Sequence, residues 1–165
     1  MTAFAMNPEL LAELLRKSVA GEPWHGPGTL DLLSGVAAGQ AARQPSVGGH
    51  AIWEIVLHMT GWQREVANRL AGHPPGMPAE GDWPAPPEPT ELNWRRAVEA
   101  LAASTEELAL AVARLTPQDL IRTIGQSDRP LGTGVTIAEA LVGVLQHNAY
   151  HSGQIALLKK PAGKV

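Results

Sequence analysis

The chain has no cysteine among its 165 residues. This absence excludes a disulfide framework, a metal site built on thiolates and a cysteine nucleophile. Any metal ion that the protein binds must therefore be held by nitrogen and oxygen atoms.

An excess of positive charge and a long apolar run are also missing. The formal net charge is -3, whereas a nucleic-acid-binding protein usually carries a basic surface. Every apolar run is interrupted well short of the roughly 20 residues that span a bilayer. The N-terminus lacks the basic start and continuous apolar segment of a signal peptide. We therefore expect no nucleic-acid or membrane partner, and a cytoplasmic location.

The composition, with 44% hydrophobic and 18% charged residues, suits one globular domain over residues 1–165. Apolar residues recur at helical spacing in four segments, which predicts long helices over about 8–20, 50–71, 90–115 and 136–160. Asn7 before Pro8 is typical of a helix start, and Thr136 with Glu139 forms a capping box. A shorter helix is expected over 29–42.

The segments between the predicted helices contain breakers. Residues 72–89 include seven prolines, which predicts an extended crossover rather than a helix or a central strand. Residues 121–135 are rich in glycine and are expected to form a loop with at most a short extended turn. The predicted fold is therefore all-α, a four-helix bundle with a long crossover connection and a short extra helix.

Three histidines lie at helix positions where an apolar core residue is expected. His147 and His151 are four residues apart, which places both rings on one helix face, roughly 6 Å apart along the axis. His58 lies at an inward position between Ile55 and Trp62. Three inward imidazoles without a common partner would each need a separate buried hydrogen bond. The pattern indicates a metal site, with a polar core network or a surface-facing pair as the alternative.

Three neutral imidazoles without a thiolate suit zinc or nickel, with iron or copper as further options. A histidine triad leaves a coordination position for water or substrate, whereas a structural site normally has a fourth protein ligand. The predicted site is therefore of the reactive type.

Other side chains are expected near the ion. Glu54, one turn before His58, and Gln154, three residues after His151, could each orient a histidine. Glu54 has the alternative of a solvated helix charge. Trp62 is expected to line the pocket, with simple core packing as its alternative. His50, at the start of the same helix, is a reserve ligand.

Three segments together resemble a known family. They are IWEIVLHMTGW around His58, HNAYHSGQI around His147 and His151, and WHGPGTLDLL near the start. They are similar to the DNA-damage-inducible DinB/YfiT-like four-helix bundles over most of the chain. The resemblance implies a stress-related, metal-binding bundle with the three histidines as ligands, commonly a homodimer. Relatives include S-transferases that use glutathione, mycothiol or bacillithiol, a maleylpyruvate isomerase, and many members without an assigned reaction.

The leading functional hypothesis is a metal-dependent enzyme in which a low-molecular-weight thiol attacks a small-molecule substrate. The thiol needs docking groups for its carboxylates, and the candidates are Arg64, Arg95, Arg96 and Arg129, each of which is individually more typical of a solvated surface charge. One alternative is a metal-dependent hydrolase with Glu54 as the base. The other is a non-enzymatic stress-related protein that binds a metal or a ligand.

Overall fold

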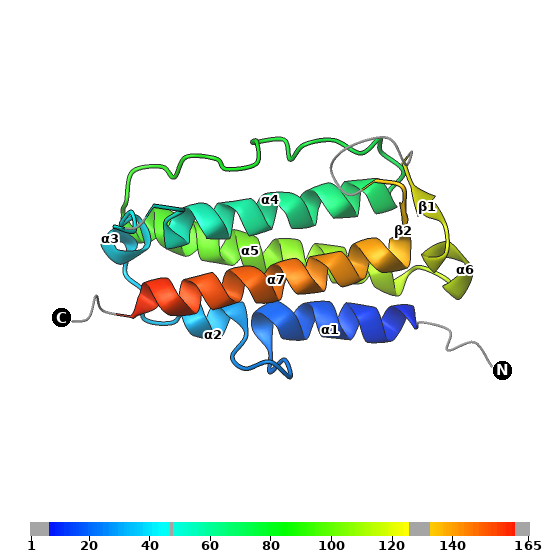
Figure 1. The fold of residues 1–165 in the computed structure, drawn as a ribbon, viewed down its shortest axis with the longest axis horizontal. Coiled ribbons are helices and arrows are strands. Elements are labelled where there is room, and N and C mark those ends of the chain that lie inside the picture. Colours follow the sequence, from blue (N-terminus) through cyan, green and yellow to red (C-terminus); the bar gives the residue numbers. More distant parts are fainter. Residues whose placement is uncertain (1–6, 47, 126–132, 161–165) are drawn as a thin grey trace.

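In the computed structural model, which describes residues 7–46, 48–125 and 133–160, four long helices lie side by side (Figure 1). They are α1 (Pro8–Ala20), α4 (Ile52–Leu70), α5 (Glu91–Ala113) and α7 (Ile137–Lys159). The prediction of an all-α helical bundle is confirmed. Within the described ranges, no helix has the length and apolar character needed to cross a bilayer.

The proline-rich segment between α4 and α5 is extended, as predicted, and follows the length of α4 (Figure 1). Proline fixes its own backbone angle and has no N–H to donate, so this segment does not form a helix. It returns the chain to the end of the bundle where α4 begins. As a result, α4 and α5 run in the same direction, and the crossover lies against the outer side of α4.

The short helices differ from the prediction in two places. Residues 29–42 form two short helices, α2 (Thr29–Leu33) and α3 (Ala38–Ala41), instead of one. The break falls at Gly35, whose φ of 73° is in the left-handed region and does not continue a right-handed helix. A further short helix, α6 (Pro117–Leu120), was not predicted, although Thr116 and Asp119 form its capping box.

The segment predicted as a loop over 121–135 contains the strand β1 (Thr123–Ile124) and the first residue of β2 (Val135–Thr136), and the two strands pair antiparallel. Residues 126–132 of that loop lie outside the described residues. The predicted capping box follows directly, because the Glu139 carboxylate accepts hydrogen bonds from the Thr136 N–H at 2.7 Å and hydroxyl at 2.8 Å. This cap fixes the start of α7, the helix that carries His147 and His151.

A buried hydrogen-bond network joins all four long helices. The side-chain oxygen of Gln63 accepts hydrogen bonds from the hydroxyls of Ser104 at 2.9 Å and Thr105 at 2.8 Å. Gln63 Nε2 donates to Asn148 Oδ1 at 3.3 Å, and Asn148 Nδ2 donates to Ser18 Oγ at 2.9 Å. Because an unpaired polar group in the core is destabilising, this network favours one axial position of α7 relative to the other helices.

Replacing the central member of this network should destabilise the fold. Gln63→Leu keeps a similar side-chain volume but leaves the buried side-chain oxygen of Asn148 without its donor, whereas the Ser104 and Thr105 hydroxyls can still donate to the Leu101 carbonyl. We expect the free energy of unfolding to fall by about 1–3 kcal/mol, measured by urea denaturation followed by circular dichroism. Arg64→Ala, at the exposed neighbouring position, is the control and should change stability by less than about 0.5 kcal/mol. Equal stability of Gln63→Leu and wild type would contradict a stabilising role.

Candidate metal centre

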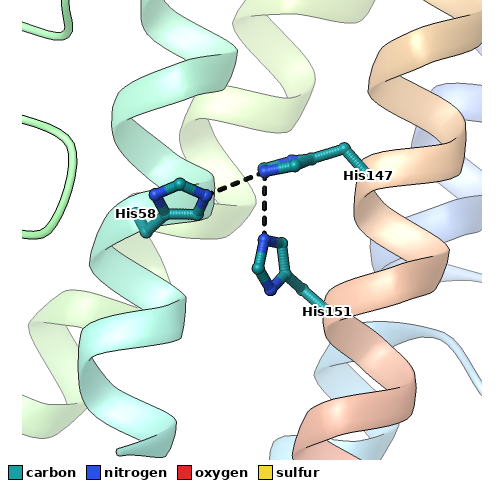
Figure 2. A group of neighbouring side chains, drawn as sticks. All are labelled: His58, His147 and His151. Atoms are coloured by element: carbon teal, nitrogen blue, oxygen red, sulfur yellow. Dashed lines mark hydrogen bonds between the residues drawn. The ribbon is translucent and has the colours of Figure 1, made fainter. Parts of the chain in front are cut away.

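The three predicted histidines meet between α4 and α7, with their Nε2 atoms facing one another (Figure 2). His147 Nε2 lies 2.9 Å from His58 Nε2 and 3.0 Å from His151 Nε2. One ligand nitrogen from each ring lies within 4.8 Å of the others. His58 and His151 are buried and His147 is half-buried. The triad could therefore hold one ion in a site largely shielded from solvent.

The other nitrogens of two rings show where the protons lie. His58 Nδ1 is 2.7 Å from the main-chain oxygen of Asp82, and a carbonyl oxygen can only accept, so Nδ1 donates. His151 Nδ1 is 2.7 Å from Gln154 Oε1 and donates to it, in the amide orientation of the structure. A neutral imidazole has one proton, so Nε2 of both rings presents a lone pair to the centre.

This arrangement leaves a conflict that a metal ion would resolve. The lone pairs of His58 and His151 both point toward His147 Nε2, which has at most one hydrogen to donate. One hydrogen cannot form two well-aligned hydrogen bonds in different directions. Nitrogens that share a tetrahedral zinc ion at about 2.0–2.1 Å lie about 3.3 Å apart, a few tenths of an ångström more than the two short distances here. The donor set therefore fits a divalent ion after small rotations of the side chains.

Asp82, which sequence reasoning missed, orients His58 from the crossover. Besides the main-chain oxygen, its carboxylate Oδ1 lies 3.2 Å from His58 Nδ1. The indole N–H of Trp62 donates to the same Oδ1 at 2.7 Å. An oxygen acceptor on the outer nitrogen of a ligating histidine fixes its ring orientation and raises its basicity. Trp62, predicted to line the pocket, does so and also holds this carboxylate.

Trp83, the next residue of the crossover, covers the triad from outside. Its ring stacks on His58 at a centroid distance of 3.9 Å, with 5° between the planes, and on His50 at 3.4 Å, with 1°. Two rings this close to one indole must occupy its opposite faces. His50, considered a reserve ligand, is therefore separated from the triad by Trp83.

Of the two residues expected to orient histidines, Gln154 lies at the triad and Glu54 does not. Gln154 accepts the His151 hydrogen bond already described. The Glu54 carboxylate accepts hydrogen bonds from the Ala51 N–H at 2.7 Å and Gln44 Nε2 at 3.0 Å. Side chains in a helix lean toward its N-terminus, so Glu54 points away from His58 toward the helix start.

A pocket of about 640 Å³ opens beside the triad, between α4 and α7. Its lining includes all three histidines, together with Asp82, Trp83 and the exposed Tyr150. The candidate thiol-docking residues Arg64, Arg95 and Arg96 are exposed and do not line this pocket. Arg129 lies outside the described residues. The open side of the triad therefore faces a cavity large enough for a small organic molecule.

Burial lowers the pKa of each histidine in the triad. For His147 the pKa falls to about 4, through desolvation first and then through His151 and His58. Desolvation also lowers the pKa of His58 and His151, against the opposing hydrogen bonds of Asp82 and Gln154. All three rings are therefore neutral at pH 7, the form in which imidazole binds metal ions.

These shifts predict that the metal-free protein loses stability as the pH falls below about 6.5. Each histidine has a lower pKa in the folded chain, so in this range the unfolded chain binds more protons and the free energy of unfolding decreases. Above it, these groups contribute no pH dependence. Thermal unfolding with a chelator at pH 8, 6.5 and 5 measures the effect. The decline should be shallower in His147→Gln, and an identical decline in both proteins would contradict the assignment.

Comparison with known proteins gives one match. The model of the DinB superfamily matches residues 25–155, a stretch that contains α4, α5, the crossover and all three histidines. No curated protein and no solved structure matches the chain significantly. The family match covers most of the chain and agrees with the helical fold. The chain therefore belongs to the DinB superfamily.

Proposed function

We propose that the protein binds one divalent metal ion through Nε2 of His58, His147 and His151, and uses it in a reaction of a small molecule. The observation that carries this proposal is that Nδ1 of His58 and of His151 each lies 2.7 Å from an oxygen, while their Nε2 atoms both lie against Nε2 of His147. Neutral nitrogen ligands favour zinc or nickel, with iron as the next option.

A reactive role is supported by the pocket, because it adjoins the ring nitrogens on which an ion would sit. A bound ion would supply positive charge that stabilises a thiolate or polarises an oxygen. The chain's own contribution is to hold the three rings and to exclude water. Asp82 and Gln154 fix two rings, and Trp83 shields His58 from the crossover side. An ion that only braced the fold would not need an adjoining cavity.

The reaction that we favour is transfer of a low-molecular-weight thiol to an electrophile. The thiol gives its proton to solvent, its sulfur forms a bond to an electrophilic carbon, and the bond from that carbon to the leaving group breaks. The leaving group departs with the electron pair. The cosubstrate supplies the sulfur, because the chain has no cysteine. Hydrolysis with Glu54 as base is less well supported, because its carboxylate is bound at the start of α4. Homodimerisation and a role in stress stay predictions from the family resemblance.

Metal content tests the ligand set directly. Wild type and His25→Ala, which changes an exposed loop histidine, should each contain about one ion per chain by elemental analysis. His58→Ala and His151→Ala should contain less than roughly a tenth of that, because two imidazoles hold an ion far more weakly than three. Stoichiometric metal in both triad variants would rule out the proposed ligands.

The reaction class is tested with glutathione, mycothiol and bacillithiol, each against 1-chloro-2,4-dinitrobenzene and monochlorobimane. We expect metal-dependent conjugation with at least one thiol, and a rate at least about tenfold lower in His151→Ala. Wild type stripped with a chelator should lose activity and regain it with added metal. If no pair of thiol and electrophile gives metal-dependent conjugation, this reaction is ruled out. Hydrolysis of a substrate without any thiol would favour the hydrolase instead.

A further inference from the structure

The pocket beside the triad is long, and it extends away from the histidines toward the other end of α4. Its lining runs along α4 from His58 to Arg69 and along α7 from His151 back to Glu139. With a rise of about 1.5 Å per residue, these stretches are each roughly 16–18 Å long. The triad therefore lies at one end of a channel between two helices, and a ligand at the triad would extend along it.

The charged and amide groups along this channel already have partners within the protein. The Arg69 side chain is 4% exposed and pairs with Glu65 at 3.0 Å. Glu139 caps α7 through Thr136, and Gln63 belongs to the buried network. Since these groups are engaged, a ligand with several charges would find little compensation here for its lost hydration.

Apolar and small residues form the rest of the channel wall. They include Trp62, Val66, Val135, Ala140, Gly143 and Val144. At Gly143 an added Cβ would meet no atom within 4 Å, so the wall is open at this point. A cavity that is mainly apolar with a few polar groups at one end is typical of sites for small organic ligands.

We infer that this channel binds the apolar part of the electrophilic substrate, an uncharged group of aromatic size, while the reactive carbon lies at the triad. The inference rests on the proposed function for the reaction, but the binding itself depends on the channel alone. It assigns the channel to the electrophile rather than to the thiol, because the carboxylates of glutathione and bacillithiol would need cationic partners and the many hydroxyls of mycothiol would need hydrogen-bond partners.

The first experiment uses the metal-free protein and the uncharged fluorophore N-phenyl-1-naphthylamine. Wild type should bind it saturably, with a fluorescence increase. Gly143→Leu should weaken binding at least tenfold, because its side chain fills the channel. Gly153→Leu is the matched control: it lies on the same helix, also in open space, but outside the pocket lining, and should bind as wild type does.

Two results would overturn the inference: no saturable binding to wild type, or equal binding by wild type and Gly143→Leu. Leucine is a good helix former, and the thermal unfolding midpoint of each variant verifies its fold. If Gly143→Leu does not fold, Gly143→Met fills the same space with a more flexible side chain and carries the same expectation.

A second experiment tests whether the channel opens onto the metal. Zinc-loaded protein is titrated by calorimetry with imidazole and with 4-phenylimidazole, which share a metal-binding group and differ in one apolar ring. The phenyl ring should strengthen binding at least tenfold in wild type, and this gain should disappear in Gly143→Leu and persist in Gly153→Leu. Equal affinity of wild type for both compounds would refute the connection. The two proposals can fail separately. If zinc does not bind, the proposed function fails and the fluorophore experiment still tests the channel. If the fluorophore does not bind, the channel inference fails and the conjugation assay still tests the proposed function.

Discussion

His58 and His151 each donate a hydrogen bond from Nδ1 to an oxygen outside the triad, and the chemistry of the site depends on these two hydrogen bonds. Once the protons are placed there, both Nε2 atoms present lone pairs to His147, which cannot satisfy both with one hydrogen. Three neutral nitrogens then face one another at the head of a pocket. Without the oxygens of Asp82 and Gln154, the same rings could take the other tautomer and form an ordinary polar cluster.

The bundle supplies these two oxygens in different ways. Gln154 lies on the same helix as His151, so local helix geometry brings it to the ring. Asp82 comes from the crossover, whose path along α4 follows from the parallel arrangement of α4 and α5 (Figure 1). The long connection therefore serves two purposes: it allows this topology and it places Asp82 and Trp83 on the outer side of His58. The buried network through Gln63 and Asn148 fixes α7, so the positions of His147 and His151 depend on the core.

The sequence was sufficient for the four helices, the crossover and the meeting of the three histidines, because helical periodicity determines which residues share an inward face. Helical side chains tilt toward the N-terminus of their helix, and this explains why only one of the two expected partners reaches the triad. Gln154 follows His151 and tilts back toward it, whereas Glu54 precedes His58 and tilts away from it. Asp82 and Trp83 could not be found by periodicity, because an irregular segment has none. Their only signal is an acid and an aromatic residue in an otherwise proline-rich stretch. The division of residues 29–42 into two helices depended on the conformation of Gly35.

The most direct measurement of the central claim is nitrogen-15 NMR of the histidine side chains, without metal and with one equivalent of zinc. Without metal, His58 and His151 should carry their protons on Nδ1. With zinc, the Nε2 resonances of His58, His147 and His151 should shift together while those of His25 and His73 stay in place. A proton on Nε2 of His58 or His151 in the metal-free protein, or an unchanged His147 with zinc, would contradict the account.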